Sequence, residues 1–554
     1  MLTVRAVCAR RVRFAACRHR DECVTELPVA GESPMKPIFL ITVFVVFLQA
    51  VPSKVFCQSS DQKIRGLLYN EDSTDFFAHR VIPAGKSAEI LNQYIDVLAN
   101  AKISALFCNI NSRRTNYRSG AWASYWDGYD PNGGDDQPFL QPIPSGPERK
   151  LWQMLVHNAW QVHQDGVDYP AHVINRCRER GIAPWISIRM NDVHFNNNLE
   201  HPFHDVIFRK SELFRKNDPG YFARCLDYAH AEVREHYRKL IAEVVDRYDV
   251  DGIELDFLRE PYLFSAGEEQ TGASVLTEWL REIRQLTEKA TALRGHPVRL
   301  SVRVPSEPEV ALGLGIDAPT WVKFGLIDLV VVSPRWRTIH FDLPIQEWRR
   351  LLGDRVSLAG GLEVNYQPEP SKPARPVTPE EAVGAALAVW SAGADAVYLF
   401  NYFQNSHPRW SPDVYQQTIS ACGSPERLKQ MPRVHSVTER DIFVPGKARR
   451  IRLPVTGSSV SFKLPLGPRP PIDWKTEVTV RFADPTPPQG TLKVTVNGTL
   501  GTPITDRPVN ADMALFSLPP SAVIGDGTDT IVVTSTDQKE MKIILLEVRL
   551  APEK

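Results

Sequence analysis

One pattern repeats along the chain between Ile64 and Phe403: a short apolar run ends in polar residues and is followed by helical periodicity. The runs cover residues 64–72, 103–111, 183–192, 252–260, 299–305, 328–334, 356–364 and 396–403. Strands that are apolar on both faces and alternate with helices form parallel sheets covered by helices. Eight such units predict an α/β protein built on a closed (β/α)8 TIM barrel, which we place at residues 62–425. No G-x-G-x-x-G sequence follows any run, which argues against a dinucleotide-binding fold.

The pattern changes after Pro432. Segments such as "TEVTVRF", "DTIVVTS" and "MKIILLEVRL" alternate apolar and polar residues and are separated by turn-forming residues. This alternation predicts a C-terminal antiparallel β-sandwich over residues 433–554, with a hairpin turn at Asn497-Gly498. The domain has one tryptophan, Trp474, and we interpret it as a structural appendage rather than a carbohydrate-binding module.

The N-terminal region resembles a targeting signal. From Met35 the chain reads "MKPIFLITVFVVFLQAVPSKVFCQSS", in which a lysine, an apolar run and small or polar residues follow one another. This order is typical of a secretory signal peptide, and the run is too short to span a membrane. We expect residues 35–58 to be the signal peptide, residues 1–34 to be a non-native or disordered extension, and the mature chain to be secreted or periplasmic. Phe56 makes lipid attachment at Cys57 unfavourable.

Charge and cysteine content narrow the class of protein further. The formal net charge is zero and 23% of residues are charged, so nucleic acid is not the expected partner. We expect no stable membrane span after signal cleavage, and the sequence leaves the oligomeric state open. Cys108, Cys177, Cys225 and Cys422 are widely spaced and form no C-x-x-C pair, so we expect them to be buried as small apolar side chains.

The run "DGIELDFLREP" places acidic residues where a barrel strand is normally apolar. Alternate residues of a strand share a face, so Glu254 and Asp256 point into the barrel while Ile253 and Leu255 point outward. Burying carboxylates is costly unless they are paired or used. Glu254 lies deeper, where we expect it to orient Arg189 or Arg303. Because barrel enzymes build their sites at the carboxyl ends of strands, we interpret these carboxylates as catalytic rather than as a structural ion pair.

Polar and aromatic residues also follow the other predicted strands. Those expected to bind substrate are Asn109, Arg189, Asn191, His194, Arg303, Glu307, Arg335, Trp336, Asn401 and Tyr402, with Trp126 from the long segment after the second strand. Carboxylates, guanidiniums, amides and aromatic faces suit the hydroxyl-rich rings of sugars. The aromatic residues of the long segment serve either to stack on sugars or to anchor the loop. The sequence contains no metal-type histidine cluster or EF-hand spacing, so we expect no metal and no cofactor.

A known family resembles this chain around the third and fourth strands. The segments "CRERGIAPWISIRMND" and "LDYAHAEVREHYRKLIAEVVDRYDVDGIELDF" are similar to the glycosyl-hydrolase-like 10 family, in which a helix containing E-V-R leads into a strand of the form D-G-I-x-x-D. The resemblance implies an exported glycoside hydrolase on a (β/α)8 barrel. Asp256 keeps its place, whereas Glu254 and Phe257 replace residues that are often histidine and aspartate in the family. The strand also resembles that of family 18 chitinases, but Leu258 stands where their catalytic glutamate would be.

Glycoside hydrolysis uses one carboxylic acid and one carboxylate, and the sequence offers several pairs. Asp256 is the first choice, as nucleophile or transition-state stabiliser. Glu260 lies in "REP", which is similar to the N-E-P acid/base site of retaining barrel glycosidases, and that similarity implies Glu363 on the seventh strand as nucleophile. We therefore predict an exported enzyme that cleaves a poly- or oligosaccharide. Two alternatives stay open: a non-catalytic carbohydrate-binding barrel, and another hydrolase or lyase on the same fold.

Overall fold

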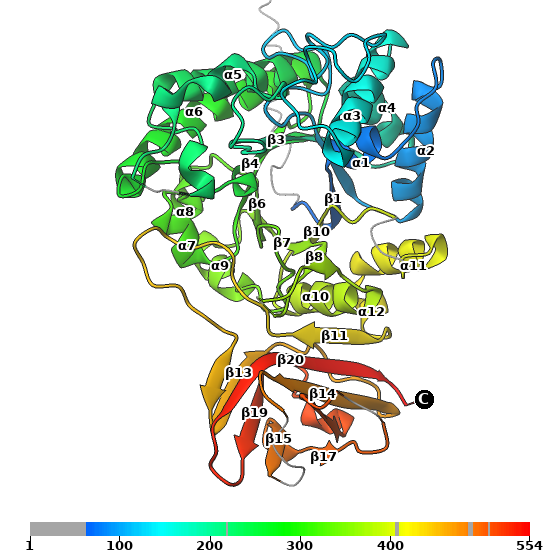
Figure 1. The fold of residues 1–554 in the computed structure, drawn as a ribbon, viewed down its shortest axis with the longest axis vertical. Coiled ribbons are helices and arrows are strands. Elements are labelled where there is room, and N and C mark those ends of the chain that lie inside the picture. The colour runs from blue at the N-terminus through cyan, green and yellow to red at the C-terminus, as the bar shows by residue number, and fades with distance from the viewer. Residues whose placement is uncertain are drawn as a thin grey trace, which may run out of the picture. The chain divides into compact units, whose positions relative to one another are not determined.

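A computed structural model describes residues 63–217, 220–369, 371–404, 409–485, 491–507 and 510–553. Eight parallel strands close into a barrel in the order β1-β10-β7-β6-β5-β4-β3-β2 (Figure 1). They are β1 (Gly66–Glu71), β2 (Ala105–Asn109), β3 (Ala183–Arg189), β4 (Gly252–Asp256), β5 (Arg299–Pro305), β6 (Leu329–Ser333), β7 (Ser357–Glu363) and β10 (Ala396–Phe400). All eight predicted strands are present, and the (β/α)8 barrel is confirmed.

Helices surround the ring of strands (Figure 1). They are α1 (Ser73–Ala78), α2 (Ser87–Asn100), α3 (Pro147–Gln164), α4 (Tyr169–Glu179), α5 (Ala231–Arg247), α6 (Glu269–Arg294), α7 (Pro308–Gly313), α8 (Ala318–Lys323), α9 (Ile345–Leu352), α10 (Pro379–Ser391), α11 (Pro412–Cys422) and α12 (Pro425–Leu428). Local sequence determines several starts. In α10, for example, Thr378 and Glu381 form a capping box that satisfies amide hydrogens at the helix start.

Large side chains fill the barrel interior toward the amino ends of the strands. Phe107 stacks on Trp185 with ring centroids 4.9 Å apart and meets Tyr398 edge to face at 5.3 Å. The neighbouring strand β4 begins with glycine because a Cβ at Gly252 would lie 2.4 Å from the ring of Trp185. This apolar layer closes the barrel interior, so any polar chemistry must occur above it, toward the carboxyl ends of the strands.

The long segment after β2 is anchored to the barrel by its own polar and aromatic residues. The Glu243 carboxylate on α5 accepts hydrogen bonds from the backbone of Gly120 and Ala121 at 2.9 and 2.7 Å. Trp122 stacks on His236 of α5 with a centroid separation of 4.1 Å. After β3, a second long segment contains the short 3-10 helices η1 (Val206–Arg209), η2 (Ser211–Leu213) and η3 (Tyr221–Arg224), and η4 (Phe257–Arg259) follows β4.

The C-terminal region consists of antiparallel sheets, as predicted. One sheet contains β11 (Arg433–Ser436), β20 (Met541–Pro552), β14 (Trp474–Phe482), β18 (Met513–Leu518) and β17 (Thr502–Pro503), and β12 (Val455–Gly457) pairs with β20. The other contains β13 (Ser459–Leu464), β19 (Asp529–Ser535), β15 (Leu492–Val496) and β16 (Thr499–Leu500). Alternating buried positions of both sheets join one apolar core. Asn497 and Gly498, both with positive φ, form the predicted hairpin turn. A short ribbon, β8 (Asn365–Tyr366) with β9 (Arg375–Pro376), and η5 (Pro520–Ala522) complete the elements.

The barrel and the sandwich meet where β11 passes along α10 (Figure 1). The backbone of α10 approaches so closely that a Cβ at Gly384 would lie 2.0 Å from the carbonyl oxygen of Val434. Beside this contact, the Tyr366 hydroxyl donates to Ser436 Oγ at 3.0 Å and also bonds to the Glu547 carboxylate of β20. Close backbone packing and buried polar contacts thus connect the two regions.

Three further sequence expectations concern cysteines and membranes. Cys108, Cys177, Cys225 and Cys422 are buried free thiols, as predicted. Within the described part of the chain, no helix combines the length and apolarity needed to cross a membrane. The predicted signal peptide at 35–58 and the extension at 1–34 lie outside the described residues.

Candidate functional site

The candidate site consists of side chains that point into the barrel near the carboxyl ends of its strands. Register pairs Arg189 of β3 with Asp256 of β4, and Asp256 with Arg303 of β5. Since paired residues of neighbouring strands share a face, these three side chains form one inward-facing row. The predicted inward direction of Glu254 and Asp256 agrees with their burial, since they are 0% and 1% exposed.

Glu254 lies one step deeper than this row. One of its carboxylate oxygens accepts hydrogen bonds of 2.8 Å from Ser187 Oγ and 2.8 Å from the Tyr398 hydroxyl. Burial, and next the charge of Asp256, raise the pKa of Glu254 to about 7, although Arg303 opposes the rise. The sequence suggested that Glu254 orients Arg189 or Arg303; among the described residues Glu254 forms no hydrogen bond or ion pair with either arginine, although the charge of Arg303 acts on its pKa. Its partners are hydroxyl groups of β3 and β10.

Asp256 ends β4 and caps the turn that follows. Its Oδ1 accepts from the amide hydrogens of Leu258 and Arg259, both at 3.1 Å, which determines the direction of the carboxylate. Arg303 Nε lies 3.2 Å from the same oxygen. Two amide hydrogens and a guanidinium thus surround one oxygen of Asp256.

Glu363 ends β7 on another side of the barrel. It is 1% exposed, and its Oε2 has no hydrogen-bond partner among the described residues. Burial raises the pKa of Glu363 well above its usual range, against the opposing charge of Arg303. Arg303 therefore acts on both Asp256 and Glu363. Its guanidinium also lies over the ring of Phe400, 3.9 Å from the ring centre.

Glu260 is held in a two-pronged ion pair. Arg335 Nε donates to Oε2 at 2.9 Å and Arg335 Nη2 donates to Oε1 at 3.1 Å. Both side chains are almost fully buried. Burial raises the pKa of Glu260 to about 7 although Arg335 lowers it. The Arg335 guanidinium also packs over Phe222 and Trp336, so Glu260 is part of a packed cluster at the rim.

A second charged network crosses the ends of β1 and β3. Arg189 pairs with Asp72, which caps α1, and with Asp192 at 3.1 Å. Asp192 also lies 2.8 Å from Nδ1 of His194, and Arg259 approaches Nε2 of that ring at 3.2 Å. Burial acts to raise the pKa of Asp192, but His194, Arg189 and Arg259 outweigh it and hold the pKa well below its usual range.

Asp72 was not predicted as a site residue. It lies 117 positions from Arg189 in the sequence, and no local motif connects the two. The only signal was the acidic end of the first apolar run, "YNED". Because β2 lies between β1 and β3 in the barrel, the Asp72–Arg189 pair spans the end of β2, where Asn109 is located.

Several predicted substrate-binding residues have other roles. Asn191 is fully buried and exchanges hydrogen bonds with the backbone of Leu226, so it anchors a loop. Trp126 is buried against His163, which corrects its expected stacking role. The Tyr402 hydroxyl donates to the backbone carbonyl of Glu363 at 3.1 Å and thereby supports the end of β7. In each case the side chain is occupied by protein contacts.

Glu307 is another correction. It precedes α7 and pairs with Arg440 Nε at 2.7 Å, which belongs to the segment that connects the barrel and the sandwich. Its side chain lines a different cavity, described below. The remaining predicted residues stay near the mouth: Asn109 is buried at the end of β2, Asn401 donates to Asp72 at 3.2 Å, and Trp336 is 38% exposed beside Arg335.

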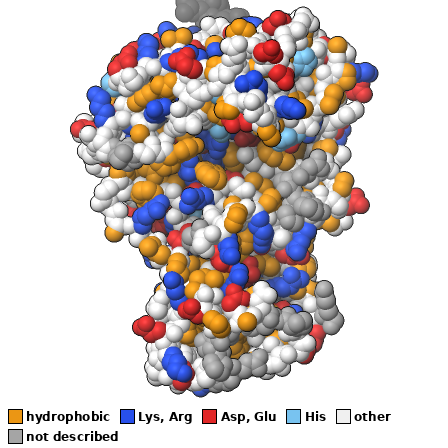
Figure 2. Space-filling model, in the orientation of Figure 1, with side chains coloured by type: hydrophobic (Ala, Val, Ile, Leu, Met, Phe, Trp, Pro, Cys, Tyr) orange, Lys and Arg blue, Asp and Glu red, His pale blue; other side chains and the backbone are white. Residues whose placement is uncertain are grey.

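A metal site needs several carboxylate, thiolate or imidazole ligands around one point. Among the described residues, no group of three or more His, Cys, Asp or Glu side chains is placed to hold a metal ion. His194 contacts Asp192 and Arg259. On the surface, Lys and Arg side chains gather in a hollow over the ring of barrel strands (Figure 2).

The family comparison covers the centre of this site. Residues 148–278 match the glycosyl hydrolase-like 10 family. The matched stretch contains β3 and β4, and with them Arg189, His194, Glu254, Asp256 and Glu260. The resemblance predicted from the sequence is therefore confirmed over these residues. No curated protein sequence matches the chain.

Many solved structures are similar at low identity. The PgaB (BpsB) glycoside hydrolase domain from Bordetella bronchiseptica is 10% identical with a TM-score of 0.38, covering 64% of this chain and 99% of that one. Maltogenic α-amylase AmyB from Thermotoga neapolitana is 10% identical (TM-score 0.35; 85% and 98% covered), and α-L-fucosidase isoenzyme 2 from Paenibacillus thiaminolyticus is 11% identical (0.39; 66% and 49%). At these identities and scores, none bears on what this chain acts on.

Proposed function

We propose that the chain is a glycoside hydrolase that cleaves a poly- or oligosaccharide with Asp256 and Glu363 as its two carboxyl groups. The observation that carries the proposal is the buried arrangement of Asp256, Arg303 and Glu363 at the carboxyl ends of β4, β5 and β7. Asp256 accepts from two backbone amides and lies beside the Arg303 guanidinium, whereas burial raises the pKa of Glu363 so that it tends to keep its proton. Such a division between two carboxyl groups is what glycosidic cleavage requires.

In the proposed reaction Glu363 donates its proton to the glycosidic oxygen as the bond to the anomeric carbon breaks. Asp256 carries the negative charge that stabilises the positive charge developing on the sugar ring, and a water or the Asp256 carboxylate completes the substitution. These roles differ from the sequence-based assignment, in which Glu260 was the acid/base group and Glu363 the nucleophile. The bidentate Arg335 contact occupies both oxygens of Glu260, which favours a positioning role for that residue.

A second candidate is a barrel that binds sugars without cleaving them. It is favoured by one observation: Asp256 and Glu363 are each 1% exposed. A sugar reaches these carboxyl groups only when side chains at the mouth move. Binding without release of new reducing ends, across a broad polysaccharide panel, would favour this candidate over hydrolysis.

The test is release of reducing sugar from that panel by the purified protein and its variants. Asp256→Asn and Glu363→Gln should each lower kcat by about 10²–10⁴-fold, the range for loss of an acid–base group. Asp395→Asn is the matched control, because Asp395 is also an aspartate paired with an arginine, with its side chain 10% exposed, but it precedes β10, at the opposite end of the barrel. Unchanged turnover in either active-site variant would refute the assignment.

We also propose that the protein is exported. The support is the order of charged, apolar and small residues from Met35 to Gln58. Expression of the full chain followed by N-terminal sequencing of the protein in the medium or periplasm tests this. A start between residues 51 and 59 agrees with the proposal, and retention of residues 35–58 in the cell-associated protein contradicts it.

A further inference from the structure

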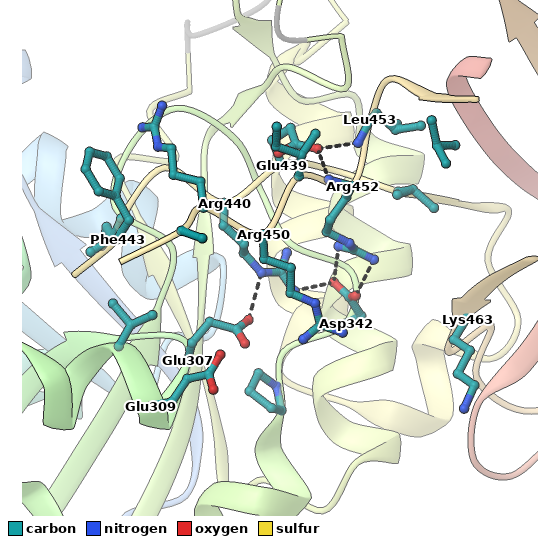
Figure 3. A pocket seen from close by; sticks show the side chains of 18 of the residues that line it. Glu307, Glu309, Asp342, Glu439, Arg440, Phe443, Arg450, Arg452, Leu453 and Lys463 are labelled. Carbon is teal, nitrogen blue, oxygen red and sulfur yellow. Dashed lines mark hydrogen bonds and ion pairs between the residues drawn. The ribbon is translucent and has the colours of Figure 1, made fainter. Parts of the chain in front are cut away.

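A cavity of about 1210 Å³ lies beside the barrel, outside the candidate catalytic site. Its walls come from three parts of the chain: the starts of α7 and α9 with the loop after β6, the connecting segment 437–455, and β13 of the sandwich. Figure 3 shows these walls from close by. The volume exceeds the roughly 300–1,000 Å³ of a typical small-molecule pocket, so it admits a segment of a chain rather than a single small molecule.

Part of the charge in this cavity holds its walls together. Arg440 pairs with Glu307 at 2.7 Å and with Asp342 at 3.0 Å, and Arg452 pairs with Asp342 at 2.7 Å (Figure 3). Glu439 accepts from the backbone amides of Arg452 and Leu453. The two arginines and three carboxylates of this set bond to one another and to backbone amides, so they fix the shape of the cavity.

The remaining charges are mostly positive. Arg337, Lys447, Arg450 and Lys463 all line the cavity and are exposed. Across the described residues, none of these four forms an ion pair with a carboxylate. Within the described part of the chain, three carboxylates on the same walls also form no ion pair: Glu309, Glu347 and Glu439. A concave surface with excess cationic groups concentrates anions and attracts them from solution.

Apolar surface accompanies these cations. The guanidinium of Arg449 lies 3.8 Å from the ring centre of Phe443, and Ile451 beside it is 70% exposed. Flat and apolar faces next to cations match the two sides of a sugar acid, which has C–H faces and an anionic substituent.

The cavity also adjoins the proposed catalytic site. Arg337 lines the cavity, and two residues earlier Arg335 holds Glu260 in the rim of the barrel. The connecting segment fixes this stretch, because Asp441 accepts from the backbone amides of Trp336 at 3.4 Å and Arg337 at 3.2 Å. A chain bound in the cavity therefore lies next to the mouth through residues 335–337.

We propose that this cavity binds an acidic glycan chain, whose carboxylate or sulfate groups contact Arg337, Lys447, Arg450 and Lys463. The inference rests on the proposed glycosidase function for the choice of a glycan, and it names the class of polysaccharide that the enzyme holds. The shared chemistry is a sugar polymer with repeated negative charges. Polygalacturonate represents the carboxylate source and dextran sulfate the sulfate source, with neutral dextran as the uncharged reference.

The test measures binding of these three polymers to the full-length protein by affinity electrophoresis and calorimetry. We expect polygalacturonate or dextran sulfate to bind and neutral dextran not to bind, with affinity that falls as salt rises. The double variant Arg450→Glu/Lys463→Glu should lose about tenfold or more in affinity, since it replaces two attractive contacts by two repulsive ones. Lys493→Glu, an exposed lysine of β15 outside the cavity, makes the same kind of change and should bind as the unmodified protein does.

Three results would overturn the inference: binding to neither acidic polymer, equal binding to neutral dextran, or an equal loss in Lys493→Glu, which indicates non-specific charge attraction. Asp256→Asn separates this inference from the proposed function. If that variant and the unmodified protein bind an acidic polymer equally and neither cleaves any polymer, the cavity stands and the hydrolase proposal fails. If the unmodified protein cleaves a polymer but the double variant binds and cleaves it equally well, the hydrolase stands and the cavity inference fails.

Discussion

Replacement of Arg335 by methionine tests the energetics of the buried ion pair with Glu260. Methionine keeps the apolar packing on Phe222 and Trp336 but removes both hydrogen bonds to the carboxylate. Because the two side chains are 6% and 3% exposed, removal of one partner leaves a buried carboxyl group without compensation. Losses of this kind are about 3–5 kcal/mol of unfolding free energy.

The effect of Arg335→Met should depend on pH. In the native protein the pKa of Glu260 is about 7, against about 4.3 in an unfolded chain, so its contribution to stability is complete below pH ~4.3 and is lost as pH rises toward 7. Without Arg335 the folded pKa rises further, and the loss continues above pH 7. The difference between variant and native protein should therefore grow by about 1.4 kcal/mol for each pH unit above 7.

Urea unfolding at pH 5.5, 7 and 8 measures these differences. Arg335→Met should be least destabilised at pH 5.5, and the double variant Glu260→Gln/Arg335→Met should recover part of the loss at pH 8. Arg507→Met is the control, since its ion pair with Glu477 is on the surface and should contribute only about 0–1 kcal/mol. A loss below about 1 kcal/mol at pH 8, or no recovery in the double variant, would refute the reasoning.

Three further outcomes are expected. First, kcat/KM should fall as pH rises and Glu363 loses its proton, at a pH well above the usual carboxyl range because burial raises the pKa of Glu363. The residual activity of Glu363→Gln should lack that fall. A native pH profile in the variant would contradict the acid role. Second, Gly384→Ala should lower stability by about 1–3 kcal/mol in a thermal melt, because its Cβ would lie 2.0 Å from the Val434 oxygen. Gly120→Ala should not, because its Cβ would lie 3.6 Å from the Glu243 carboxylate, an ordinary contact distance. Third, Asp342→Asn should cost about 1–3 kcal/mol of unfolding free energy in urea at pH 7 and less at pH 3. Burial acts to raise the pKa of Asp342, but Arg440 and Arg452 outweigh it and lower the pKa, and the stabilisation from these ion pairs is lost as pH falls below ~4. An equal cost at both pH values would argue against the ion pairs.

The barrel could be predicted from the sequence because its signals are local. Each strand is an apolar run of five to seven residues in the structure, and its neighbours along the chain carry helical periodicity. Strand alternation also determined that Glu254 and Asp256 share an inward face, since the direction of a side chain in a strand depends only on its parity. The hairpin at Asn497-Gly498 was also predictable, because its signal is a local pair of turn-forming residues.

The partners of those carboxylates were decided by the tertiary structure. Arg189 pairs with Asp72 from 117 positions away, and Arg335 reaches Glu260 across 75 positions. Glu254 bonds to Tyr398 from the opposite end of the barrel sequence, 144 positions distant. Pairing over such separations depends on barrel register and loop paths, which leave no periodic trace in the sequence.

Glu307 illustrates the same division. The sequence correctly indicated that it follows the fifth strand, but two residues beyond a strand end are enough for a loop to turn a side chain away from the mouth. In the folded chain Glu307 forms an ion pair with Arg440 in a cavity whose walls include the connecting segment and β13. Strand periodicity is a property of neighbouring residues, so it could be predicted from the sequence. The pairing of charges depends on where distant segments pack, and only the tertiary structure determines this.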